Sequence, residues 1–211
     1  FPYTTLFRSR PAMPAQADAA YTPVTIENID EKGAPVSQLY EQPPQRVVAV
    51  WQNSIETLLA LGVGDRIIAG MGVPNAKYIR PEYRAAYEAI PYTSLEHLDV
   101  ETILMMQPDL IVGWSSTFSP KVLRGTAFWA GRGVHTYIAP SSARATKSKT
   151  IAQECEDIRN LGRIFGREER ANALVGEMEH EIAFVAEKAA GMEQRPRALV
   201  IELMGKEIRS S

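Results

Sequence analysis

Short apolar runs alternate with stretches of helical periodicity over the first two thirds of the chain. The continuous apolar runs are 46–51 (RVVAVW), 66–70 (RIIAG), 109–114 (DLIVGW) and 135–139 (HTYIA). Runs of this length are typical of strands that are buried on both faces of a parallel sheet. Helical patterns lie near 53–61, 81–89, 99–106 and 119–130. The alternation predicts an α/β fold: a Rossmann-like lobe with a mainly parallel sheet flanked by helices.

Capping residues indicate where three of these helices begin. Asn53 with Glu56 has the spacing of a capping box, in which Asn53 caps the helix. Asp99 can cap the helix that follows it. Ser119 followed by Pro120 is a typical helix start, because proline fits the first helical position. Ahead of the sheet, 23–28 (PVTIEN) and 36–40 (VSQLY) predict two short strands.

The alternation of apolar runs and helical patterns ends after Ala145. One helix is predicted from about Lys147 to Phe165, and a second from about Glu168 to Ala190 with a 3.6-residue apolar stripe. At 1.5 Å per residue the second helix is on the order of 34 Å long, too long for a crossover in a small sheet. The run 197–203 (RALVIEL) then predicts one more buried strand.

These elements predict a domain order along the chain. Residues 1–9 (FPYTTLFRS) resemble the translation of a sequencing adapter, and 10–20 (RPAMPAQADAA) suit a flexible tether. We expect an artefactual or disordered tail and linker, an N-terminal lobe, a backbone helix between lobes and the start of a truncated second lobe. The corresponding ranges are 1–20, 21–166, 167–192 and 193–211.

Composition and charge exclude some classes of function. The formal net charge is -2, whereas nucleic-acid binding needs a clustered basic face. No stretch approaches the roughly 18 apolar residues of a membrane span. The single cysteine, Cys155, allows no internal disulfide and suits a small buried side chain.

The loops after the four apolar runs carry the candidate chemistry, because ligands of parallel α/β sheets bind beyond the carboxyl ends of the strands. The expected ligand contacts are Trp51, Gln52, Asn53, Met71, Tyr78, Arg80, Trp114, Ser115, Ser116, Ser141 and Ser142. Flat apolar rings with neutral hydrogen-bonding groups suit a bulky organic chelate. Other roles remain open: the two tryptophans also suit the core, Asn53 a helix cap, and Tyr78 and Arg80 either an anionic ligand or solvated surface.

Catalytic and metal-binding patterns are missing from the sequence. The three histidines have no zinc-like spacing, so neither a protein metal site nor an intrinsic cofactor is predicted. A dinucleotide fingerprint needs G-x-G-x-x-G after the first strand, where this chain has Gln52-Asn53-Ser54. No P-loop or nucleophile elbow occurs, which argues against an enzyme. A nucleotide-binding α/β enzyme and a sensor or signalling domain remain the alternatives from other classes.

Three segments together resemble the helical-backbone class of solute-binding proteins of ABC importers. They are 44–72 (PQRVVAVWQNSIETLLALGVGDRIIAGMG), 98–114 (LDVETILMMQPDLIVGW) and 161–182 (LGRIFGREERANALVGEMEHEI). The resemblance covers roughly Val24 to Leu203 and implies two α/β lobes joined by one long helix, with ligand held between the lobes. It implies an extracytoplasmic monomer, periplasmic or anchored as a lipoprotein, whose signal sequence is not in this chain.

The resemblance also implies ligand and partner. The expected ligand is an iron(III) chelate, most simply a ferric siderophore, with haem and cobalamin as alternatives. The expected protein partner is the permease of the importer, and no nucleic acid is expected. By its match to the acidic helix of the family (DVETI), Glu101 would be the exposed glutamate that docks onto the permease. A first-turn glutamate that favours the helix dipole is the other reading of Glu101.

Overall fold

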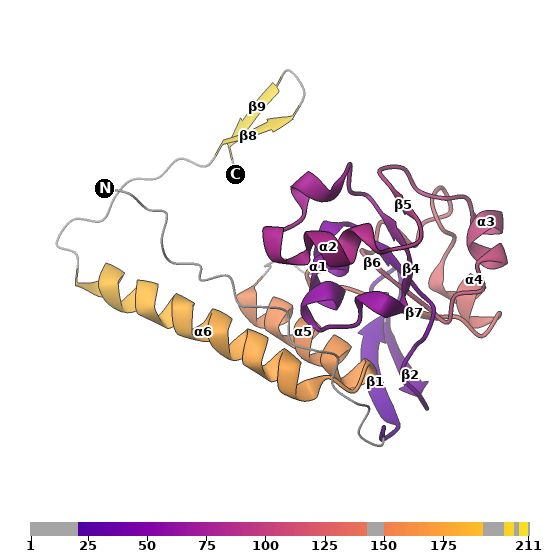
Figure 1. The fold of residues 1–211 in the computed structure, drawn as a ribbon, viewed down its shortest axis with the longest axis horizontal. Helices are drawn as coiled ribbons and strands as arrows, with labels where there is room; N and C mark the ends of the chain where they lie inside the picture. Colours follow the sequence, from indigo (N-terminus) through magenta and orange to yellow (C-terminus); the bar gives the residue numbers. More distant parts are fainter. Residues whose placement is uncertain (1–20, 143–149, 192–200, 205–206, 211) are drawn as a thin grey trace. The chain divides into compact units, whose positions relative to one another are not determined.

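A five-stranded parallel sheet lies at the centre of the fold, in the order β5-β4-β3-β6-β7 (Figure 1). The computed structural model of the protein describes residues 21–142, 150–191, 201–204 and 207–210. The strands are β3 (Val47–Val50), β4 (Ile67–Met71), β5 (Thr93–Ser94), β6 (Leu110–Gly113) and β7 (His135–Ile138). The predicted α/β fold with a parallel sheet is therefore confirmed. The two-residue strand β5 is an addition that no apolar run predicted.

Helices cover both faces of this sheet. The α-helices around it are α1 (Gln52–Ala60), α2 (Arg84–Glu88), α3 (Val100–Met105), α4 (Thr126–Ala130) and α5 (Ile151–Ile164). Short 3-10 turns are η1 (Gly64–Arg66), η2 (Ala76–Tyr78), η3 (Pro81–Tyr83) and η4 (Pro140–Ser142). Successive strand residues point to opposite faces: Val47 and Ala49 pack in the cluster of α1, α2 and α5, and Val48 and Val50 in the cluster of α3 and α4. All four are fully buried, which explains the continuous apolar runs in the sequence.

An antiparallel hairpin borders the β7 edge of the sheet. Its strands are β1 (Val24–Ile29) and β2 (Pro35–Tyr40). The Asn28 side chain donates to the carbonyl of Ile138 and accepts from its N–H, at 3.0 and 2.9 Å. The Gln38 side chain bonds Thr136 in the same two-sided way, at 2.7 and 3.2 Å. Two amide side chains thus satisfy backbone groups of an edge strand, which protects the edge from pairing with another chain.

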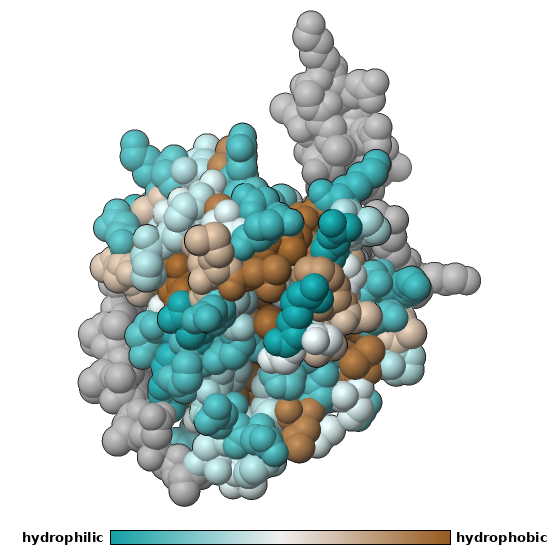
Figure 2. All heavy atoms as spheres, turned by 90° about the vertical axis from the view of Figure 1, so that its right-hand side faces the viewer, coloured by the Kyte–Doolittle hydropathy of each residue, from teal (hydrophilic) through white to brown (hydrophobic). Residues whose placement is uncertain are grey.

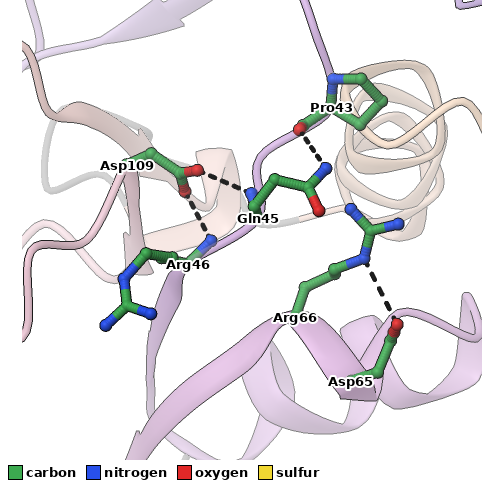
Figure 3. Close-up of polar contacts among 6 residues, drawn as sticks. All are labelled: Pro43, Gln45, Arg46, Asp65, Arg66 and Asp109. Carbon is green, nitrogen blue, oxygen red and sulfur yellow. Dashed lines mark hydrogen bonds and ion pairs between the residues drawn. The ribbon is translucent and has the colours of Figure 1, made fainter.

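The amino ends of β3 and β6 are fastened by one carboxylate. Asp109 accepts hydrogen bonds from the backbone N–H groups of Gln45 and Arg46, at 2.6 and 2.9 Å (Figure 3). The guanidinium of Arg46 donates in turn to the carbonyl of Met106 at the end of α3. These bonds fix the register of β3 beside β6, so the carboxyl ends of the two strands emerge side by side at the opposite edge.

One predicted helix cap is present and one is not. Asp99 caps α3 as predicted, because its Oδ1 accepts from the N–H of Thr102 at 2.7 Å. The prediction that Asn53 caps α1 was wrong. Trp51 occupies the N-cap position without a side-chain hydrogen bond, and Asn53 lies inside the helix. The Asn53 side chain bonds a tryptophan from another loop instead, a long-range contact that local sequence does not reveal.

The predicted helix start at Ser119 was also wrong. The segment after β6 forms turns, with the N–H of Leu123 bonded to the carbonyl of Thr117, and α4 begins only at Thr126. The cap comes from the β1–β2 turn: Glu31 Oε2 accepts from the N–H and the hydroxyl of Thr126, at 3.0 and 2.8 Å. Burial by itself would raise the pKa of Glu31, but these hydrogen bonds outweigh it and lower the pKa.

The two long helices follow the predicted pattern. Thr150 and Gln153 form a capping box at the start of α5, and Gly166 has a positive φ of 61° after its end. Residues 147–149 of the predicted helix lie outside the described part of the chain. The next helix, α6 (Glu168–Ala190), has the predicted bounds. Ala171 and Val175 in its first turns are fully buried.

The chain divides into two compact units after Val175. The second unit contains the rest of α6, where Ile182, Phe184 and Val185 are exposed, and the hairpin of β8 (Ile201–Met204) with β9 (Glu207–Ser210). The predicted strand 197–203 overlaps β8, its first four residues lie outside the described ranges, and β9 was not predicted. The tail 1–20 lies outside them as well, and the expected boundaries at 166 and 192 stay predictions. None of the described helices is long and apolar enough to cross a membrane.

Candidate ligand-binding site

A hollow of about 470 Å³ lies at the carboxyl ends of the central strands. Its lining residues come from the loop after β3, the first turns of α1, and the loops after β4 and β6. They are Trp51, Gln52, Asn53, Glu56, Gly72 and Trp114. Parallel strands deliver these loops to one edge of the sheet, so four predicted contact residues meet in the hollow.

Two tryptophans form the apolar wall of the hollow. Trp51 follows β3 and Trp114 follows the adjacent strand β6, and their ring centroids lie 5.5 Å apart with planes inclined by 32°. The indole N–H of Trp51 donates to Thr117 Oγ1 at 3.1 Å, and that of Trp114 donates to Asn53 Oδ1 at 2.8 Å. Because both N–H groups are satisfied within the protein, this wall presents ring faces rather than polar donors. Trp114 is 40% exposed, which makes its ring accessible.

The backbone holds Trp51 in an uncommon conformation. Its φ is 76°, in the left-handed region that non-glycine residues rarely adopt. Gly72 has a φ of 88°, and a Cβ at this position would lie 2.8 Å from the Trp51 ring. The N–H of Trp51 bonds to the carbonyl of Met71 at 2.8 Å. The loop after β4 thus packs closely against Trp51. A non-glycine residue with a positive φ is a form of backbone strain that is common at functional sites.

Polar side chains of α1 connect the hollow to the loop after β4. Gln52 Nε2 donates to the carbonyl of Tyr78 at 2.8 Å and to Glu56 Oε1 at 3.1 Å. The backbone N–H of Arg80 donates to the same Glu56 oxygen at 3.0 Å. Tyr78 does not line the hollow, and the residue is 60% exposed. The Arg80 guanidinium contacts Glu82 at 2.6 Å, so this cation is engaged beside the hollow rather than in it.

The predicted serines connect two loops. The backbone N–H of Ser115 donates to Ser142 Oγ at 2.9 Å, and Ser115 Oγ donates to the carbonyl of Ser142 at 2.8 Å. The Ser142 hydroxyl donates onward to the carbonyl of Ala139. These hydroxyls hold the loops after β6 and β7 together. Ser116 is exposed and Ser141 half-buried, so both stay predicted contacts outside the lining of the hollow.

The expectation that Met71 contacts the ligand is contradicted by its burial. Its side chain is fully buried, and its sulfur accepts a hydrogen bond from the N–H of Leu98 at 3.1 Å. The residue is the last of β4, where the side chain points into the core cluster of α3 and α4. Met71 therefore supports the edge of the sheet from within and does not reach a ligand.

His97 contacts Trp51 beside the hollow, which the sequence did not indicate. Its ring stands edge-on to Trp51, with centroids 5.0 Å apart. Burial lowers the pKa of His97, because desolvation disfavours the charged imidazole. Its Nδ1 is buried without a partner in the part of the chain that is described. A lone histidine in a loop carries no sequence signal, because only the fold brings it to Trp51.

A second hollow, of about 390 Å³, adjoins His97 on the side of α3. Its lining includes Asp99, Glu101, Lys121 and Arg124. Because α3 runs back from the carboxyl edge of the sheet, its first turn lies at the same edge as the tryptophans. Glu101 is exposed in this turn. The charged residue predicted to dock a partner is therefore on the surface.

The side of the molecule with α3 and α4 carries a small apolar patch. Figure 2 shows apolar atoms gathered near the middle of this face, with polar atoms around them. Met105 on α3 is 85% exposed and Leu95 in the preceding loop is 56% exposed.

Metal ligation by the protein has no support in the described ranges. No group of three or more His, Cys, Asp or Glu side chains among them could hold a metal ion. Cys155 is buried. The hollow is lined by aromatic rings, amide side chains and one carboxylate.

Comparison with known proteins decides the family. The pattern of the family described as periplasmic binding protein matches residues 47–208, which is most of the chain. The chain belongs to the periplasmic binding protein family. The resemblance carried by the three sequence segments is thereby confirmed.

Several relatives of this periplasmic binding protein have known structures or curated names. A periplasmic binding protein from Veillonella parvula is 49% identical with a TM-score of 0.83, over 90% of this chain and 60% of that one. An ABC-type Fe3+-hydroxamate transport system from Saccharomonospora viridis is 29% identical with a TM-score of 0.64, over 80% and 57%. An uncharacterized ABC transporter substrate-binding lipoprotein from Bacillus subtilis is 23% identical over 172 residues, 79% of this chain and 48% of its own. The chain thus spans about half to three fifths of the length of these relatives.

Proposed function

We propose that the protein is the extracytoplasmic solute-binding component of an ABC importer, which captures a metal chelate and delivers it to the permease. The observation that carries this proposal is the pair of tilted tryptophans at the carboxyl edge of the sheet, with both indole N–H groups already bonded. Such a wall binds the flat or apolar surface of an organic ligand.

A ferric siderophore is the ligand that we favour. The relative from Saccharomonospora viridis is named as an Fe3+-hydroxamate transport system. No group of three or more His, Cys, Asp or Glu side chains in the described residues could hold a bare ion, so we expect iron to arrive already enclosed in its chelator. Haem and cobalamin remain alternatives, because their ring systems can also stack on tryptophan.

The proposed location and mode of action follow the same reasoning. The Bacillus subtilis relative is named as a lipoprotein, which supports a position outside the cytoplasm, in the periplasm or at the cell surface. We infer that the protein acts as a monomer and meets the permease through the face that carries α3. Glu101 is exposed there beside Lys121 and Arg124, which gives this surface a defined charge pattern.

Replacing Glu101 with arginine is expected to lower transport strongly while the ligand affinity stays unchanged. An exposed carboxylate at a docking surface steers and orients the encounter, and reversing its charge opposes the partner surface. Uptake of radiolabelled ferric siderophore into cells that depend on this protein measures transport, and a titration of the purified protein measures affinity. Glu88→Arg on α2 is the matched control, an exposed charge reversal outside both hollows. Unchanged uptake in the Glu101 variant would contradict the docking role.

A further inference from the structure

An anionic ligand requires a positively charged site, whereas the lining of the hollow carries a carboxylate. Of the described residues that line it, Glu56 alone is ionisable. The cation expected there from the sequence, Arg80, directs its guanidinium to Glu82 at 2.6 Å and lies over the ring of Tyr83 at 5.9 Å. This wall of the hollow therefore carries one negative charge.

The Glu56 carboxylate is held in place. Its Oε1 accepts hydrogen bonds from the N–H of Arg80 at 3.0 Å and from Gln52 Nε2 at 3.1 Å. Both bonds are to the same oxygen, and no described residue bonds to Oε2. Gln52 is itself fixed by the carbonyl of Tyr78. The carboxylate is thus anchored through one oxygen, and the other can accept a hydrogen bond from a ligand.

The tryptophan wall prefers the same sign of ligand charge. Indole faces attract cations through their quadrupole, and Trp51 and Trp114 line the hollow together with Glu56. A ligand carboxylate or catecholate in this position would face a fixed negative charge and two electron-rich ring faces, so it would be repelled. A protonated amine would be attracted by both.

We propose that Glu56 is a specificity-determining residue that selects chelates bearing a protonated amine, with the remainder of the chelate against the two tryptophans. The inference rests on the proposed function, because it names the charge class of the ligand at that same site. The amine would donate a charge-assisted hydrogen bond to the carboxylate, which is stronger than a neutral one.

The test uses two ferric trihydroxamates that differ by one charge. Ferrioxamine B carries a terminal ammonium group, and its N-acetylated form has the same iron centre without that charge. Isothermal titration of the full-length protein is expected to show roughly tenfold tighter binding of the ammonium form. Glu56→Gln is expected to abolish this preference by weakening the ammonium complex. Glu88→Gln, an exposed acidic position on α2, is expected to keep it.

The outcomes separate this inference from the proposed function. Equal affinity of the unaltered protein for the two complexes overturns the inference, and this comparison needs no folded variant. An unchanged preference in Glu56→Gln also overturns it, as does a protein that binds another chelate but not the ammonium form. All these results leave chelate binding intact. Absence of binding to ferric hydroxamates, ferric catecholates, haem and cobalamin alike would overturn the proposed function instead.

Discussion

Replacing Asp157 with asparagine is expected to raise the free energy of unfolding at pH 7 by up to about 4 kcal/mol and to leave it nearly unchanged at pH 4. Asp157 lies in α5 and is 5% exposed. Burial raises its pKa to about 7; the nearby Tyr137 hydroxyl opposes this shift, and Glu154 and Glu156 add to it. The Tyr137 hydroxyl and Asp157 Oδ1 are both buried, and neither has a hydrogen-bond partner in the described structure. The two groups are therefore close but do not form a hydrogen bond.

The sign follows from the proton balance. The folded protein binds the Asp157 proton more tightly than the unfolded chain, whose aspartate has the ordinary pKa of 3.8. The stabilisation is therefore complete below that value and is lost as the pH rises towards 7. Asparagine keeps the shape of the protonated acid but cannot ionise, so it avoids the cost of a buried charge.

Urea unfolding at pH 4, 5.5 and 7 measures this effect. The difference between the variant and the unaltered protein should grow with pH across this range. Glu88→Gln, an exposed position on α2 that does not shift the pKa of Asp157, is the control and should change stability little at any of the three pH values. A similar loss of stability in Asp157→Asn at pH 4 and pH 7 would show that the carboxyl group is not the source of the pH dependence.

Replacing Trp114 with alanine is expected to weaken chelate binding by about thirtyfold, the size typical of an aromatic anchor at a binding surface. The change removes an exposed ring face of the hollow and the donor to Asn53 Oδ1. Trp114→Phe keeps a ring and should lose less affinity. Fluorescence or calorimetric titration of the purified variants measures the effect.

Two further observations make the tryptophan test decisive. Met105→Ala removes a side chain that is more exposed than Trp114 but lies outside the hollow, so its affinity should match that of the unaltered protein. Circular dichroism of Trp114→Ala should show an unchanged fold, because Trp114 belongs to neither buried core cluster. An affinity for the chelate within twofold of the unaltered value would remove Trp114 from the site.

The sequence predicted the sheet and the long helix well because their signals are local. The central strands β3 and β6 are runs of residues buried on both faces, and α6 has an apolar stripe that ends before Gly191. The two helix starts were predicted wrongly because long-range contacts decide them. Glu31 caps α4 from 95 residues away in the sequence, and the Asn53 side chain bonds Trp114, which lies 61 residues away. Strand β5 was missed because two residues carry no pattern.

The site shows the same limit. The edge of the sheet that carries the loops follows from parallel topology, so residues such as Trp51 and Gln52 could be named in advance. Which side chains reach the hollow depends on packing: Met71 turns into the core, and His97 is brought to Trp51. The charge of the hollow also depends on tertiary contacts, because Arg80 pairs with Glu82.

The most direct test of chelate binding is a tryptophan-fluorescence titration of the full-length protein. Two of the three tryptophans form the wall of the hollow, and the third, Trp129, is fully buried in the core. A ligand that lies on Trp51 and Trp114 must therefore change the emission. We expect a saturable change with a ferric hydroxamate, and a smaller one in Trp114→Ala. No saturable change with ferric hydroxamate, ferric catecholate, haem or cobalamin would contradict it.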